Sequence, residues 1–153
     1  MKPDFMIREV CKSDMDQLIE LCRQHADYEQ NEYNPNGKFI RLTALLFNDN
    51  PPLKCRVAET DGVLIGYVTF MKQFSTWDAS YYVYMDCLFL TEDTRGKGIG
   101  KELMNEVVRY AESEYCKEVQ WQTPTFNSKA IRFYRNYGAF SKEKERFFLD
   151  LST

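Results

Sequence analysis

The sequence holds a single histidine, His25, among its 153 residues. A zinc site built on several histidines, or a hydrolase triad, would have to depend on that one side chain. We therefore expect no metal site and no such triad. We predict His25 to be a surface residue of a helix.

The cysteines form neither a disulfide framework nor a zinc-binding pattern. Their number is odd, they lie far apart in the sequence, and no Cys-x-x-Cys pair occurs. We expect reduced and mostly buried thiols. The five are Cys11, Cys22, Cys55, Cys87 and Cys116.

Long apolar runs and an excess of one charge are also missing. Twenty Lys and Arg against 23 Asp and Glu give a net charge of −3, which does not favour nucleic-acid binding. No apolar run reaches the roughly 20 residues of a membrane span. No signal-peptide core follows the first residues. These absences predict a cytoplasmic protein that binds neither nucleic acid nor membrane.

The composition that is present fits one domain over residues 1–153, with 44% hydrophobic and 28% charged residues. Alternation with a period of two predicts strands, and apolar spacing of three and four predicts helices. The order indicates a mixed α/β, or α+β, layered fold. The strands are expected over 5–10, 56–60, 63–71, 81–90, 118–123 and 147–151. The helices are expected from residue 13 (with Ser13 and Asp16 as a capping box), over 39–47, over 98–115 and from residue 127 to Gly138.

The strongest functional signal is the segment Thr94-Arg95-Gly96-Lys97-Gly98-Ile99-Gly100-Lys101 between a strand and a helix. Unpaired amides at a helix N-terminus bind anions, and glycines let phosphate oxygens approach the backbone. The spacing excludes both a Walker A loop and a Gly-x-Gly-x-x-Gly dinucleotide fingerprint. The segment predicts a phosphate site, with a turn that only reverses the chain as the alternative.

Arg95, Gly98 and Gly100 form an Arg-x-x-Gly-x-Gly pattern, and here the sequence resembles the GNAT superfamily of acyl-CoA-dependent N-acyltransferases. The resemblance covers most of the chain. It implies a mostly antiparallel twisted sheet of about 6–7 strands flanked by about four helices. It also implies acetyl-CoA as cosubstrate, with its pantetheine along Leu88, Phe89 and Leu90. Its pyrophosphate would lie against Arg95, Gly96, Lys97, Gly98, Ile99, Gly100 and Lys101.

A second segment, residues 127–139, is similar to the family pattern Asn-x-x-Ala-x-x-x-Tyr-x-x-x-Gly-Ala. Asn127 and Tyr134 are seven residues apart, so a helix places them on one face. The resemblance implies that Asn127 binds the pantetheine arm and that Tyr134 protonates the leaving thiolate. The alternative is that Asn127 only caps a helix and Tyr134 only fills the core.

Asp86 is the candidate general base, because a charged residue within an apolar strand is costly unless it is used or paired. The alternative is an acid that points from an edge into solvent. The stretch looks most like the polyamine (diamine) acetyltransferase branch, which has Glu at this position. We expect the neighbouring Cys87 to point to the opposite face and to belong to the core.

The acceptor is predicted to be a small cationic amine. Six acids and one Arg lie between Asp14 and Glu32, and the resemblance places Tyr28, Glu29 and Glu32 along the amine site. Trp77, Asp78 and Tyr84 would add aromatic and acidic walls. A polyamine, an amino acid and an aminoglycoside all fit. Acetylation of a protein N-terminus or lysine, and a non-catalytic acyl-CoA-binding module, are the alternatives, and a homodimer is possible.

Overall fold

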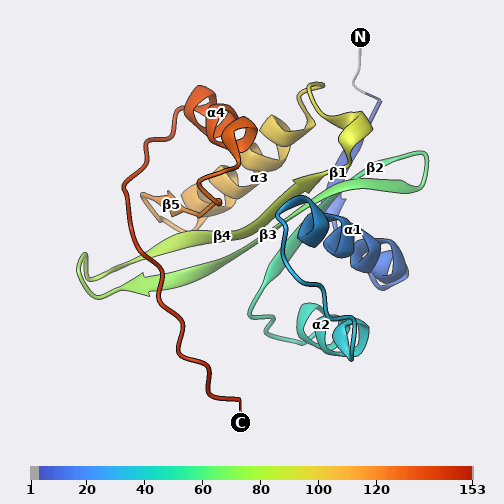
Figure 1. Ribbon diagram of the computed structural model, residues 1–153, viewed down its shortest axis with the longest axis horizontal. Coiled ribbons are helices and arrows are strands. Elements are labelled where there is room, and N and C mark those ends of the chain that lie inside the picture. Colours follow the sequence, from blue (N-terminus) through green and yellow to red (C-terminus); the bar gives the residue numbers. More distant parts are fainter. Residues whose placement is uncertain (1–3, 153) are drawn as a thin grey trace. The chain divides into compact units, whose positions relative to one another are not determined.

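The computed structural model describes residues 4–152 and divides the chain into two compact units, Met1–Gln122 and Thr123–Thr153 (Figure 1). The first unit is built on one five-stranded sheet with the order β1-β2-β3-β4-β5. Neighbouring strands run antiparallel except β4 and β5, which are parallel. The strands are β1 (Met6–Glu9), β2 (Lys54–Thr60), β3 (Val63–Ser75), β4 (Ser80–Leu90) and β5 (Val119–Gln120). The expected mostly antiparallel sheet is therefore confirmed.

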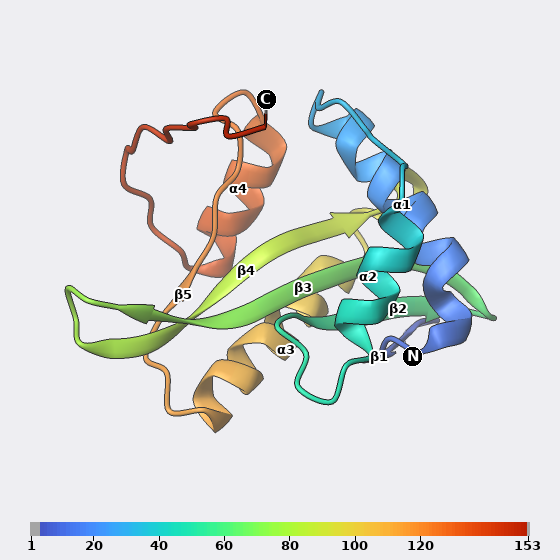
Figure 2. The ribbon, with the colours of Figure 1, turned by 90° about the horizontal axis from the view of Figure 1, so that it is seen from below.

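Helices cover both faces of this sheet, as Figures 1 and 2 show. α1 (Met15–Tyr28) and α2 (Lys38–Leu46) pack on one face, and α3 (Ile99–Ser113) packs on the other. Two short 3-10 helices, η1 (Lys12–Asp14) and η2 (Glu92–Thr94), lead into α1 and follow β4. In the described part of the chain, no helix combines the length and the apolar character that crossing a membrane requires.

Sequence periodicity accounts for these helices. The α3 stripe predicted from its spacing is buried at Leu103, Met104 and Val107, all at most 1% exposed. On the other face, Leu18 and Leu21 of α1 pack against Tyr67 and Phe89 of the sheet. The sheet is thus buried between two apolar layers, which is the layered arrangement that the sequence predicted.

The turn between β2 and β3 follows directly from its two residues. Asp61 and Gly62 have φ angles of 49° and 82°, the left-handed conformation that a two-residue hairpin turn requires. The predicted Asp-Gly hairpin is confirmed.

The hairpin of β3 and β4 extends beyond its neighbours. β2 pairs with β3 only as far as Phe70, and β5 pairs with β4 at Val83 and Tyr84. Residues 73–75 and 80–82 therefore pair only with each other. At the tip, Trp77 is 97% exposed.

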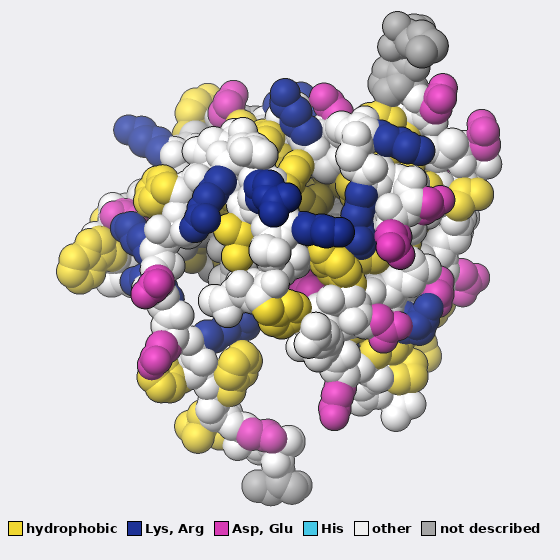
Figure 3. All heavy atoms as spheres, turned by 45° about the horizontal axis from the view of Figure 1, so that its top comes forward, with side chains coloured by type: hydrophobic (Ala, Val, Ile, Leu, Met, Phe, Trp, Pro, Cys, Tyr) yellow, Lys and Arg dark blue, Asp and Glu magenta, His cyan; other side chains and the backbone are white. Residues whose placement is uncertain are grey.

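The second unit contains α4 (Ser128–Tyr137). The Asn127 side chain accepts a hydrogen bond from the Ala130 amide at 3.3 Å, so it caps the helix. Gly138, with φ of 117°, ends it in the left-handed conformation. Beyond it the chain is extended, and hydrophobic side chains stand out along it in Figure 3.

Three expectations about the elements are wrong. The described residues form five strands rather than about 6–7. Residues 147–151 are not a strand, because a strand exists only through hydrogen bonds to a neighbouring strand and no described strand pairs with them. Ser13 and Asp16 do not form the capping box either. The Cys11 amide donates to Asp14 Oδ2 at 2.8 Å instead.

Candidate active site

The glycine turn lies between η2 and α3, where Gly96 and Gly98 have φ angles of 79° and 84°. Side chains other than glycine rarely adopt this conformation. A Cβ built on either glycine would meet no other atom within 4 Å. The outer surface of the turn is therefore open, and side chains at these positions would occupy that space.

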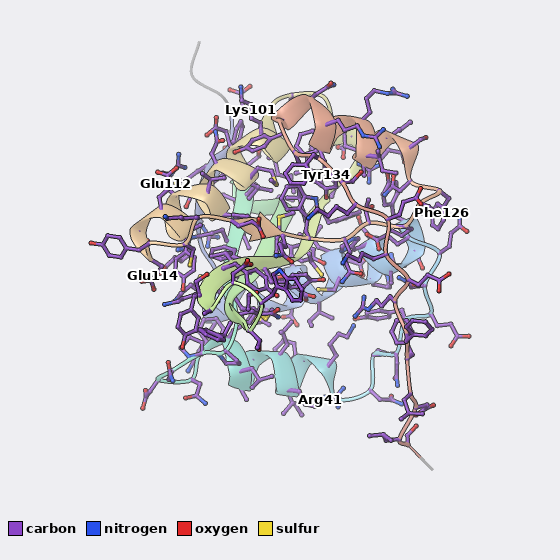
Figure 4. The ribbon with its side chains drawn as sticks, turned by 90° about the vertical axis from the view of Figure 1, so that its left-hand side faces the viewer. Arg41, Lys101, Glu112, Glu114, Phe126 and Tyr134 are labelled. Atoms are coloured by element: carbon purple, nitrogen blue, oxygen red, sulfur yellow. The ribbon has the colours of Figure 1, made fainter. Side chains whose placement is uncertain are left out.

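The backbone of the turn presents donors toward this space. Gly98 is the N-cap of α3, and the first hydrogen bond of the helix runs from the Glu102 amide to the Gly98 carbonyl at 3.2 Å. The amides that precede Glu102 at a helix start have no acceptor within the helix. Lys97 and Lys101 are exposed, and Figure 4 labels Lys101 on the first turn of α3. A pyrophosphate fits this combination of free amides, open glycines and two lysines.

Two predicted members of the turn contribute only through their backbone. Ile99 is 3% exposed, because its side chain faces the core under α3. Gly100 is buried beside it. Their amides still belong to the helix N-terminus, so both remain candidates for binding a phosphate group through main-chain N–H groups.

Arg95 has a different position from the two lysines. Its Nε and Nη2 atoms donate to the Leu90 carbonyl at 3.2 and 3.0 Å. Its guanidinium lies 4.3 Å from the Tyr28 ring centroid. The side chain thus ties the turn to the end of β4 and to α1, a contact that the sequence spacing did not indicate.

Asp86 occupies a β-bulge in β4. Thr69 of β3 pairs with Cys87, and the next residue, Phe70, pairs with Met85. Asp86 is therefore the extra residue between them, and its side chain is exposed. The Cys87 amide donates to Thr69 Oγ1 at 3.1 Å.

The bulge makes one expectation wrong. Cys87 does not point away from Asp86, since its Sγ donates to Asp86 Oδ2 at 3.7 Å. The strict alternation of a strand is interrupted by the extra residue, so adjacent side chains come to the same side. Cys87 packs against the core under α1, as expected. Burial raises the pKa of its thiol to about 12, which keeps it neutral and makes it a poor nucleophile.

The prediction for His25 is also wrong, because its side chain is only 12% exposed. Nε2 lies 2.7 Å from Glu29 Oε2, and Nδ1 lies 2.8 Å from the Tyr67 hydroxyl. The ring stacks on Phe89 at 5.1 Å between centroids. The missed signal is spacing: His25 follows Leu18 by seven residues, which places it on the buried face of α1.

The predicted acceptor residues fall into separate groups. Tyr28 and Glu29 lie at the end of α1, where Tyr28 contacts Phe89 with centroids 6.3 Å apart. Glu32 is exposed in the loop that follows. Tyr84 on β4 accepts a hydrogen bond from Gln122 at 2.7 Å.

Trp77 and Asp78 lie at the tip of the β3–β4 hairpin, where Asp78 bonds Ser75. Six strand residues separate this tip from Asp86, or roughly 20 Å at the rise of a β-strand. The first unit therefore does not bring these two residues together with Asp86.

Three of the six acidic residues between Asp14 and Glu32 form ion pairs with arginines of the first unit. Asp14 binds Arg8, and Glu20 and Asp27 both bind Arg23. The predicted acidic wall is therefore reduced to Asp16, Glu29 and Glu32, of which Glu29 also bonds His25.

In the second unit, Asn127 and Tyr134 lie on α4 at the two-turn separation that the sequence predicted, and Figure 4 labels Tyr134 there. The Tyr134 ring contacts Phe133 with centroids 5.4 Å apart. The capping role of Asn127 is confirmed by its bond to Ala130. The roles of both residues toward a cosubstrate stay predictions.

Residues 12–139 match the Acetyltransferase (GNAT) family. The chain is 27% identical over 141 residues to the thialysine N-epsilon-acetyltransferase of Mus musculus, covering 87% of this chain and 82% of that protein. It is 22% identical over 148 residues to spermidine/spermine N(1)-acetyltransferase-like protein 1 of Homo sapiens, covering 92% of this chain and 21% of that protein. An aminoglycoside N-acetyltransferase solved with CoA shares the fold, with a TM-score of 0.82 and 19% identity over 99% of this chain and 98% of that one.

Proposed function

Since the chain belongs to the GNAT family of acetyltransferases, we propose that this N-acetyltransferase acetylates a primary amine of a small cationic acceptor by direct attack in a ternary complex. Acetyl-CoA is its cosubstrate, as membership of the family implies. Within that family the chain resembles the polyamine and thialysine acetyltransferases.

The glycine turn is the observation that carries this proposal. Gly96 and Gly98 leave the backbone open, and α3 begins there with amides that lack a helical acceptor. Lys97 and Lys101 add charge beside them. This set of groups supports binding of the pyrophosphate of acetyl-CoA through Gly96 to Lys101, with Leu88, Phe89 and Leu90 along the pantetheine.

The transfer needs a neutral amine, and deprotonating an alkylammonium near pH 7 costs about 4 kcal/mol. Asp86 is the proposed base, because the bulge exposes its carboxylate on an otherwise apolar strand. Tyr134 is the proposed acid that protonates the departing thiolate, and Asn127 the proposed ligand of the pantetheine arm. The assignment to Asp86 rests on its position in β4 and on the resemblance.

A cationic acceptor is supported by the acids at the end of α1. Glu29 and Glu32 would attract an ammonium group, and Tyr28 offers an aromatic face. The mouse relative is named for thialysine, an amino acid with a side-chain amine. Polyamines, amino acids of this kind and aminoglycosides are the acceptor classes we propose.

Release of free CoA thiol with a panel of amines tests the proposal. We expect turnover with diamines and basic amino acids in the presence of acetyl-CoA. The matched comparison is 1,5-diaminopentane against pentylamine, which differ by the second ammonium. A preference for the diamine supports a cationic acceptor site, and no thiol release with any amine contradicts the proposed reaction.

We also propose that residues 1–153 act as one acetyltransferase domain and that the enzyme is a cytoplasmic homodimer. The family resemblance and the aromatic-rich strands β3 and β4 support the dimer. Sedimentation equilibrium at micromolar concentration tests it, and a mass of 18.1 kDa would contradict it.

A further inference from the structure

A chain of polar side chains runs through the apolar core between α1 and the sheet. It begins at Asp86 and continues through Cys87, whose Sγ donates to Asp86 at 3.7 Å. Tyr67 follows, hydrogen-bonded to Cys87, and its hydroxyl lies 2.8 Å from His25 Nδ1. Glu29 ends the chain, 2.7 Å from His25 Nε2. Core packing alone does not explain this arrangement, because buried polar groups are costly.

The chemistry of the end groups sets the direction of these bonds. A carboxylate only accepts, so the hydrogen between His25 and Glu29 belongs to Nε2. In neutral imidazole the other nitrogen is then an acceptor. Tyr67 therefore donates its hydroxyl hydrogen to Nδ1, and its oxygen is left as an acceptor. The single Cys87 hydrogen is directed at the ionised Asp86, and it turns to the Tyr67 oxygen once Asp86 carries a proton.

We propose that Cys87 and Tyr67 pass the proton that Asp86 takes from the acceptor amine to His25. This inference rests on the proposed function and on Asp86 as its base. His25 then acts behind the base rather than on the acceptor, and it returns Asp86 to the carboxylate needed for the next turnover.

The transfer balances without any further reactant. The O–H bond of protonated Asp86 breaks as an S–H bond forms on Cys87, and the original Cys87 proton moves to the Tyr67 oxygen. The Tyr67 proton moves to His25 Nδ1. One proton has then passed from a carboxylic acid to an imidazole, while the thiol and the phenol are neutral before and after.

The surroundings suit this role. Burial raises the pKa of Cys87 to about 12 and the pKa of Tyr67 well above its ordinary value, so both keep their hydrogens at neutral pH. The imidazolium formed at His25 faces Glu29, whose side chain is 25% exposed and gives a route to water. The imidazolium loses one proton to water in total. If that proton leaves from Nε2 past Glu29, the ring first holds its hydrogen on Nδ1, and the cycle closes when Nε2 takes a proton from water and Nδ1 releases one to solvent.

Other titratable and charged groups also face this cluster. Cys22 of α1 hydrogen-bonds Tyr67, and Lys38 of α2 acts electrostatically on Cys22. The Arg95 guanidinium lies over the Phe89 ring at 5.6 Å, on which His25 stacks. The tautomer of His25 is the measurement that bears directly on the relay.

Because His25 is the only histidine, ¹⁵N-histidine labelling of the full chain yields one imidazole in an NMR spectrum. We expect the Nε2–H tautomer at neutral pH, with a hydrogen-bonded Nδ1 whose shift changes in Tyr67→Phe. An Nδ1–H tautomer would overturn the relay, because that nitrogen could then take no proton from Tyr67. This readout does not depend on turnover.

Steady-state kinetics, with the amine of the panel that gives the highest turnover, provide the second test. We expect Tyr67→Phe and His25→Gln each to lower kcat at least about tenfold while both KM values change less than about twofold. Tyr110→Phe, which removes a hydroxyl on the α3 side of the sheet, is the matched control and should leave kcat unchanged. Unchanged kcat in the two variants, or a rise in KM that follows lost stability, overturns the relay. An inactive wild-type chain with the Nε2–H tautomer contradicts the proposed function instead.

Discussion

A single buried carboxylate fixes the start of the first helix. Asp14 is 4% exposed, and Arg8 donates to both of its oxygens, at 2.7 and 2.8 Å. The Cys11 amide donates to it as well. The Arg8 hydrogen bond lowers the pKa of Asp14 from 3.8 to about 2. The carboxylate therefore stabilises the folded chain whenever the pH is above the ordinary pKa of an aspartate.

Replacing this residue should cost stability in a pH-dependent way. The lowered pKa of Asp14 corresponds to about 2 kcal/mol, present above pH 4 and lost as the pH falls toward 2. We expect Asp14→Asn to lower the free energy of unfolding in urea by at least about 2 kcal/mol at pH 7, and by less at pH 2.5. Asp16→Asn, at an exposed position two residues further along, is the control, with an expected change below about 0.5 kcal/mol. Equal losses at both pH values would contradict the ion-pair explanation.

The proposed role of the Tyr134 hydroxyl as an acid can be tested by a single substitution. If it protonates the thiolate, Tyr134→Phe should lower kcat at least about tenfold and leave the Kd for CoA nearly unchanged. Tyr137→Phe, on the same helix, removes a hydroxyl outside the proposed machinery and serves as the control. Steady-state rates with calorimetric CoA binding measure both quantities. A turnover number equal to wild type would remove the acid role.

At the scale of elements, the sequence predicts what is encoded locally. The α3 stripe, the Asp61-Gly62 turn and the stop at Gly138 each depend on a few adjacent residues, and each is found in the structure. The bulge at Asp86 depends on how β3 and β4 pair, so no local pattern reveals it. The missing last strand has the same cause, since residues 147–151 are mostly apolar but no described strand pairs with them.

The candidate site likewise has some features that local sequence predicts and others that depend on tertiary contacts. The glycine turn was predictable because Gly96 and Gly98 must adopt a left-handed conformation within one short segment. The position of Arg95 against Leu90 and the burial of His25 required tertiary contacts. Whether a charged side chain reaches a ligand or a neighbouring carbonyl is decided by the fold around it.

The glycine turn can be tested as an element with a matched pair of variants. Gly98→Val places a Cβ into the open space at the start of α3, so we expect CoA affinity to fall more than about 30-fold. Strain at this φ should cost about 1–2 kcal/mol and leave the fold intact. Gly62→Val has a similar φ of 82° and equally open surroundings in the β2–β3 turn. It should lose similar stability and keep its affinity, and unaltered calorimetric binding by Gly98→Val would refute the pyrophosphate placement.

At the scale of the whole molecule, charge is close to balanced, at −3 overall. We therefore expect the attraction of an anionic cosubstrate to come from the local lysines at the turn rather than from the net charge. Within the first unit, the ion pairs of Arg8 and Arg23 further reduce the acidic surface along α1. Recognition should then depend on short-range contacts.

Salt should consequently act mainly on acetyl-CoA. Screening shortens from about 10 Å at 0.1 M to about 3 Å at 1 M. We expect the KM for acetyl-CoA to rise at least about threefold over this range, because the proposed contacts of the lysines with phosphates would lie at the surface. Lys101→Gln should raise the KM at low salt and flatten this dependence. A wild-type KM that is constant with salt would argue against a charged contribution from the turn.

The extra residue in β4 changes the face of the sheet on which the later side chains of the strand lie. Met85 lies opposite Phe70, whose ring contacts Tyr110 of α3, whereas Cys87 packs toward α1, although only one position separates the two. Removing Asp86 would restore strict alternation and turn every later side chain of the strand to the other layer. Deleting Asp86 would thus exchange the α1-facing and α3-facing side chains over residues 87–90. Phe89 would then no longer face His25.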